Sequence, residues 1–143
     1  MPLPKQSLRN HARLVPLFHF ALFALVAGNF FHAARTLLPL SQDSFWRMVV
    51  ATALLLMMWY VRAFPLAAQD RVIRLEERLR LAELAPELAV QTGRITSAQW
   101  TALRFADDGE FVELVRRVLD GQLQAPGDIK RAIVHWRADH HRV

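Results

Sequence analysis

The sequence predicts an all-α protein: a two-helix transmembrane hairpin followed by a small cytoplasmic helical domain. Three observations lead to this fold class. Apolar residues make up 53% of the 143 residues, and they are concentrated in two early blocks. Charged residues lie almost entirely outside these blocks, and no segment shows the alternation of apolar and polar residues that is typical of a strand. This segregation favours a membrane protein over a soluble protein with a single core.

We expect three regions along the chain. A basic N-terminal segment at 1–13 precedes the transmembrane hairpin at 14–64, and the cytoplasmic domain at 65–143 contains one amphipathic helix followed by three short helices. Most of the net charge of +5 lies around the apolar blocks, where it is expected to set membrane topology. The chain has no cysteine, which excludes disulfides and thiolate chemistry.

The first apolar block, LVPLFHFALFALVAGNFFHAA at 14–34, contains no Asp, Glu, Lys or Arg. A helix rises about 1.5 Å per residue, so this block is long enough to cross the ~30 Å hydrocarbon core of a bilayer. A signal peptide is the alternative interpretation, because basic residues precede the block. A second apolar block follows at once, and this favours a membrane span.

The second block, at 45–64, has an uncharged centre between Arg47 and Arg62. These two arginines can reach opposite interfaces of the bilayer, and aromatic residues near both ends are typical of membrane boundaries. The segment at 35–44 allows only a tight reversal, so the two spans should be antiparallel. Basic residues before the first span and after the second predict that both termini are cytoplasmic.

Three polar residues inside the spans, His19, Asn29 and Thr52, are candidates for contacts between the two membrane helices. In an antiparallel hairpin Asn29 and Thr52 lie at similar depth and can share a hydrogen bond worth about 0.6 kcal/mol. A proton or ion path is the alternative for such residues. Two spans alone cannot enclose a pore, so interhelical contact is the expected role.

Pro65 should break or kink the membrane helix, because proline lacks a backbone N–H and disfavours helical geometry in the residue before it. A new amphipathic helix is expected at 66–85. Ion pairs between Asp70 and Arg74 and between Glu76 and Arg80 should support it. Apolar residues recur along it with spacings of four and three, in one stripe: Ala68, Val72, Leu75, Leu79 and Ala82.

The centre of this stripe, at Val72, Leu75 and Leu79, has three alternative partners. It can pack on the rest of its own domain, form a two-helix seam with a second copy of the chain, or lie on anionic lipid. The balanced charges around the stripe disfavour lipid, and its short length weakens the seam. We therefore expect it to face the interior of the domain, while a homo-oligomer or a larger membrane complex remains an open alternative.

Start and stop signals define the three short helices that follow. Thr96 with Gln99, and Asp107 with Glu110, each form a capping-box pattern. Gly121 fits a C-terminal cap, and Asp128 fits the N-cap of the last helix. The apolar faces of these helices predict a small core: Trp100, Phe105, Phe111, Leu114, Val118, Ile133 and Trp136.

The C-terminal sequence HWRADHH suggests a metal site. If it is helical, His135 and Asp139 lie four residues apart on one face, and His140 follows. A metal-dependent hydrolase using these three residues is one alternative function, although zinc needs converging ligands whose orientation is fixed by further hydrogen bonds. A polar helix end is the simpler interpretation. We expect no resident cofactor or metal.

A second alternative is a membrane-tethered module that binds nucleic acid, because residues 97–105 and 108–120 resemble a helix-turn-helix. The second of these helices mixes acidic with basic residues and would meet phosphates with little net charge, so no nucleic-acid partner is expected. The sequence also contains no glycine-rich phosphate loop and no nucleophile with an obvious base.

Three blocks of sequence resemble a family of small bacterial two-span inner-membrane proteins that is catalogued as a domain of unknown function. These blocks are FPLAAQDRVIRLEERLRL, TALRFADDGEFVELVRRVL and IKRAIVHWRADHHRV. The resemblance implies an all-α fold in the bacterial inner membrane and implies no activity. We therefore expect a non-enzymatic accessory or scaffold protein that presents its helical domain at the cytoplasmic face for self-association or partner binding.

Overall fold

Helices account for every regular element in the part of the chain that the computed structural model describes, Leu8 and residues 15–139. This confirms the all-α fold class. The chain divides into two compact units. In the described part of the chain, one unit ends at Leu66 and the other begins at Ala67. The long helix α2, Gln42–Leu84, contributes to both.

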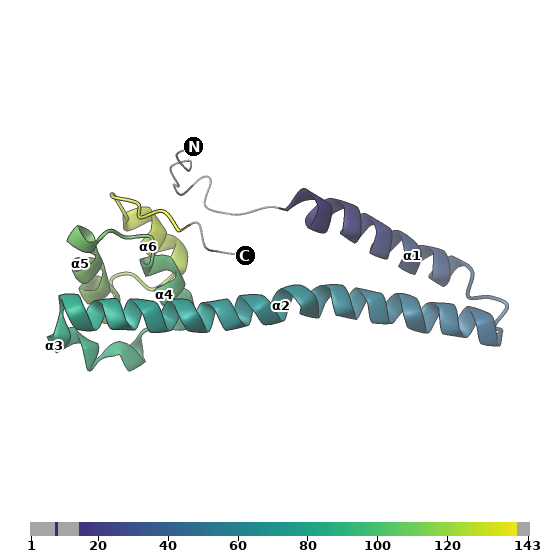
Figure 1. Ribbon diagram of the computed structural model, residues 1–143, viewed down its shortest axis with the longest axis horizontal. Helices are drawn as coiled ribbons and strands as arrows, with labels where there is room; N and C mark the ends of the chain where they lie inside the picture. The colour runs from purple at the N-terminus through teal and green to yellow at the C-terminus, as the bar shows by residue number, and fades with distance from the viewer. Residues whose placement is uncertain (1–7, 9–14, 140–143) are drawn as a thin grey trace. The chain divides into compact units, whose positions relative to one another are not determined.

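The first unit contains the two apolar blocks. A π-helical segment, η1 (Leu17–Leu22), runs directly into α1 (Phe23–Arg35), and the chain reverses over residues 36–41 before α2 begins (Figure 1). The helical stretches Leu17–Arg35 and Gln42–Leu84 are both long and apolar enough to cross a membrane. Most of their large apolar side chains are exposed, as expected for helices that no protein core surrounds.

Of the two outcomes predicted at Pro65, the break is wrong, because α2 passes through this residue, and the kink stays a prediction. A proline inside a helix removes one backbone hydrogen bond and crowds the carbonyl four residues earlier. The residues around Pro65 are mostly strong helix formers such as Leu, Ala and Arg, and they continue the helix past this local defect. The amphipathic segment after Pro65 is therefore a continuation of α2 and not a separate helix.

The second unit places short helices against the last turns of α2 (Figure 1). The three predicted short helices are present as α4 (Ser97–Leu103), α5 (Asp108–Leu119) and α6 (Pro126–Ala132). Two shorter elements precede them and were not predicted, α3 (Pro86–Ala89) and the 3-10 turn η2 (Thr92–Arg94).

The helix caps follow the predictions in part. Thr96 and Gln99 form the complete capping box. Asp107 accepts a hydrogen bond from the backbone N–H of Glu110 at 3.1 Å, but Glu110 does not bond back, so this is a simple N-cap. Gly121 follows α5 with a φ of +76°, a conformation that favours glycine. The predicted cap at Asp128 is wrong, because α6 begins two residues earlier, at Pro126.

The predicted core is confirmed. Trp100, Phe105 and Phe111 are fully buried, Leu114, Val118 and Ile133 are buried, and Trp136 is partly buried against them. The core also contains residues that the sequence did not single out, including Leu81 from α2.

The C-terminal segment, residues 133–139, is not helical. Trp136 forms an isolated antiparallel bridge with Ala106. The backbone N–H of Arg137 donates to the carbonyl of Phe105 at 2.7 Å, and the N–H of Asp107 donates to the carbonyl of His135 at 3.1 Å. The predicted helical face of His135 and Asp139 therefore does not exist.

Candidate functional site

Within the second unit α2 has two different faces. Its inner face, which we define as Ile73, Glu77 and Leu81, is buried against the domain, with exposed fractions of 5%, 5% and 0%. Its outer face, defined as Val72, Leu75 and Leu79, is exposed by 54%, 59% and 58%. The expectation that the apolar stripe packs inside its own domain is therefore wrong.

Arg80 explains why the inner face can include a glutamate. Its guanidinium pairs with Glu77 at 3.0 Å and with Asp108 at 2.6 Å, and it donates to the carbonyl oxygen of Ala106 at 2.8 Å. It also lies over the ring of Phe111, 4.1 Å from the ring centre. Arg80 thus links α2 to Asp108, the first residue of α5. Burial raises the pKa of Glu77 above its ordinary value, and the pairing with Arg80 opposes that rise.

These contacts replace the ion pairs that the sequence predicted along α2. Arg80 pairs with Glu77 and Asp108 and not with Glu76. Asp70 receives a hydrogen bond from the hydroxyl of Thr101 at 3.4 Å and does not pair with Arg74. In the part of the chain that the structure describes, Arg74 and Glu76 have no ion-pair partner.

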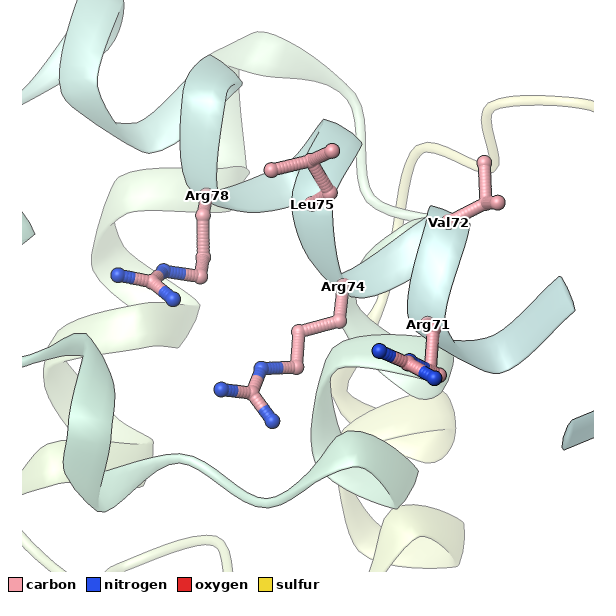
Figure 2. Close-up of a pocket in the computed structure, with 5 residues that line it drawn as sticks. All are labelled: Arg71, Val72, Arg74, Leu75 and Arg78. Atoms are coloured by element: carbon pink, nitrogen blue, oxygen red, sulfur yellow. The ribbon is translucent and has the colours of Figure 1, made fainter. Parts of the chain in front are cut away.

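Charges of opposite sign flank the outer face. The guanidinium groups of Arg71, Arg74 and Arg78 extend to the same side of α2 (Figure 2). They line a shallow depression together with Val72 and Leu75. At 100° per residue, the exposed Glu76 and Glu83 lie on the opposite flank of the apolar stripe. The outer face is therefore an apolar strip with a basic edge and an acidic edge.

The structure describes two of the three residues proposed for a metal site, His135 and Asp139, and both have other contacts. Asp139 pairs with the buried Arg104 at 2.9 Å, and the guanidinium of Arg104 lies 4.2 Å from the centre of the Phe105 ring. His135 lies in the extended C-terminal segment, and His140 lies outside the described residues. The geometry that suggested a hydrolase site is therefore absent from the described part of the chain.

A different cluster, Asp107, Glu110 and His135, brings potential ligand atoms within 4.8 Å of one another. Each carboxylate already has a structural role. Asp107 caps α5, and Glu110 accepts hydrogen bonds from the backbone N–H groups of Val134 and His135, both at 3.0 Å. Glu110 thus fixes the C-terminal segment to the start of α5. These contacts could not be predicted from sequence patterns, because the partners lie 24 and 25 residues apart.

Two of the three polar residues singled out in the apolar helices, His19 and Thr52, form local hydrogen bonds. His19 Nδ1 lies 2.9 Å from the carbonyl oxygen of Val15, and the hydroxyl of Thr52 donates to the carbonyl of Met48 at 2.9 Å. Asn29 lines a shallow depression with residues of both α1 and α2, including Ala33 and Trp46. The role of His19, Asn29 and Thr52 as contacts between membrane helices stays a prediction.

The helix pair α4 and α5 offers little free positive charge for DNA. Arg116 of α5 pairs with Glu87 at 3.5 Å. Glu113 of α5 and Asp120, which directly follows this helix, add exposed negative charge. Phosphate binding requires several uncompensated basic side chains along one surface. The outer face of α2 is therefore a stronger candidate for a functional surface than α4 and α5.

Comparison with known proteins places the chain in a family. A family model described as "Family of unknown function (DUF6526)" matches residues 1–143, so the chain belongs to this family. The family description carries no activity. No curated protein and no solved structure matches the chain.

Proposed function

We propose that this chain is a non-enzymatic protein of the bacterial inner membrane, where it presents a small helical domain as an interaction module. The first unit acts as the anchor, because its two helices are long enough to cross a bilayer and expose their apolar side chains. The second unit acts at the cytoplasmic surface. Scaffold and accessory proteins work in this way, by binding other proteins rather than by converting a substrate.

One observation carries the proposal: the domain completes its own core and leaves the outer face of α2 uncovered. Val72, Leu75 and Leu79 are more than half exposed, although the rest of the domain buries a contiguous core that includes Trp100 and Phe105. Contiguous exposed apolar surface with charged edges is typical of protein interaction sites. We therefore assign the outer face as the contact surface of the module.

Site-specific photocrosslinking in native membranes tests this assignment. A photoreactive amino acid at Leu75 or Leu79 should give a discrete protein adduct on irradiation. The same group at Glu113, which is exposed on α5, is the matched control and should give none. No adduct at Leu75, or equal adducts at all three positions, would overturn the assignment.

A second measurement separates an interaction surface from an internal core. Leu75→Asp should remove the adducts formed from Leu79 and leave the helical content of the full chain unchanged, because Leu75 is 59% exposed. Leu81→Asp is the matched control, since Leu81 is fully buried, and it should unfold the domain. Loss of helical content in Leu75→Asp would contradict the proposal.

The anchor and its orientation are tested with reporter fusions. A reporter that is active only in the periplasm should be active when inserted at Ser41, in the short connection between α1 and α2. The same reporter fused after Val143 should be inactive, because both termini are proposed to be cytoplasmic. The reverse pattern would refute the orientation, and release of the chain by alkaline extraction would refute the anchor.

A further inference from the structure

We infer that the partner bound by the outer face of α2 is a second copy of this chain, with the two α2 helices parallel and in register. This inference rests on the proposed function, because it names the occupant of the same surface. It depends on how apolar and charged residues are ordered around the exposed side of α2.

The apolar residues of the outer face follow a heptad pattern, written abcdefg, in which positions a and d form the contact between two helices. Val72 and Leu79 occupy a positions, and Leu75 occupies the d position between them. Ala68 and Ala82, both exposed, extend the d positions by one heptad in each direction. The inner-face residues fall at b, f and c, on the other side of the helix, so a second helix can bind without disturbing the domain core.

The charged residues at the edges of this strip select a parallel pair. Arg71 and Arg78 occupy g positions, and Glu76 and Glu83 occupy e positions. In a parallel two-stranded coiled coil, each g residue lies beside the residue five positions later on the other helix, at e. Arg71 therefore meets the partner's Glu76, and Arg78 meets the partner's Glu83. Two-fold symmetry repeats both pairs, so all of these charges are matched.

The antiparallel alternative places like charges together. In that arrangement g positions face g positions and e positions face e positions, so arginine would meet arginine and glutamate would meet glutamate. All four side chains are exposed, and none of them has an ion-pair partner in the described part of the chain. Their charges are thus available to a second copy.

Insertion in one membrane favours the same geometry. Two copies with the proposed orientation emerge from the bilayer in the same direction, and confinement to a surface raises their effective concentration. Confinement offsets the short length of the strip, which covers about two heptads and would be marginal for free peptides. An anionic lipid surface fits less well, because Glu76 and Glu83 on the acidic edge would be repelled.

Disulfide crosslinking tests register and direction, because the chain contains no cysteine of its own. Single substitutions Ala68→Cys, Leu75→Cys and Ala82→Cys should each give a homodimer band when full-length protein is oxidised in native membranes. Glu113→Cys, exposed on α5, is the matched control and should give none. A band at Leu75→Cys alone would indicate an antiparallel pair and overturn the inference, as would the absence of all three bands.

Charge reversal tests the edges independently. The double variants Arg71→Glu/Arg78→Glu and Glu76→Arg/Glu83→Arg should each lower the Leu75→Cys crosslinked fraction by about tenfold, because every edge pair becomes repulsive. The two variants carry complementary charges, so co-expression with different tags should restore a mixed dimer close to the wild-type level. Failure to form the mixed dimer would refute the pairing of g with e.

These results separate the inference from the proposed function. If Leu75 forms a photoadduct with a different protein and no cysteine variant gives a homodimer, the inference is wrong and the proposed function stands. If Leu75 forms no adduct of any kind, both are wrong. The wild-type membrane density should be used throughout, because excess protein raises random collisions between copies.

Discussion

Arg80→Ala should destabilise the second unit more than removal of any other arginine from the part of α2 that belongs to this unit. The substitution removes the ion pairs to Glu77 and Asp108, the hydrogen bond to the carbonyl of Ala106 and the contact with the ring of Phe111. It also leaves the carboxylate of Glu77 buried without its partner. Removal of one member of a buried ion pair costs about 3–5 kcal/mol.

We expect a cost at the lower end of this range, because only one of the two carboxylates that pair with Arg80 is buried. The side chain of Arg80 is 11% exposed and that of Glu77 is 6% exposed, so their interaction is poorly screened by water. Asp108 is 71% exposed, and its pair with Arg80 contributes little. We therefore expect a loss of about 3 kcal/mol in the free energy of unfolding. Arg74→Ala is the matched control and should change it by less than about 0.5 kcal/mol, because Arg74 is exposed and has no ion-pair partner in the described residues.

Hydrogen exchange on the full chain in detergent micelles measures this loss, through the opening free energies of amides in α4 and α5. The double variant Arg80→Ala/Glu77→Gln should recover part of the loss, because it removes the unpaired carboxylate. The deficit of Arg80→Ala should also shrink as pH falls. Without Arg80 the pKa of Glu77 rises further, so the native state binds a proton at a pH where the unfolded state does not. A cost no larger than that of Arg74→Ala would refute the reasoning.

Three further predictions concern other contacts of the domain. Burial raises the pKa of Glu77 above 4.5, so wild-type stability should increase as pH falls from neutral toward 4.5, and Glu77→Gln should flatten this dependence in thermal unfolding. Glu110→Ala should speed hydrogen exchange at the Val134 and His135 amides by about tenfold, whereas Glu113→Ala should not. Gly121→Ala should cost about 1 kcal/mol because its φ is +76°, and Gly93→Ala, which has open space and no positive φ, should cost less.

The sequence predicted correctly those features that depend on residues close together in the chain, namely helix caps and apolar periodicity. The capping box of Thr96 and Gln99 involves residues three positions apart, and the apolar periodicity of α4 and α5 located most of the core. The predicted helix break at Pro65 was wrong. The prediction weighed one missing hydrogen bond and not the helix-forming residues on both sides, which decide whether a long helix continues.

Features that depend on distant residues were missed. Arg80 reaches Asp108, 28 positions away, so the sequence favoured the nearer Glu76 as its partner. Arg80 also pairs with the buried Glu77 of the inner face. Because a glutamate makes this face polar in the sequence, the fully apolar outer face was predicted to be the buried one. The extended C-terminal segment was missed because its hydrogen bonds go to Phe105 and Glu110 and not to its own residues.

If the chain pairs in a membrane as proposed, the two faces of α2 link the thermal stability of the domain to the density of the protein in that membrane. Ile73 and Leu81 are buried on one side of the same turns that expose Leu75 on the other, so a domain that unfolds also loses the surface proposed for pairing. Binding that occurs only in the folded state raises the melting temperature by mass action. In a bilayer the governing quantity is the number of copies per unit area. Vesicles with a higher protein-to-lipid ratio should therefore hold a more heat-resistant domain, although no residue has changed.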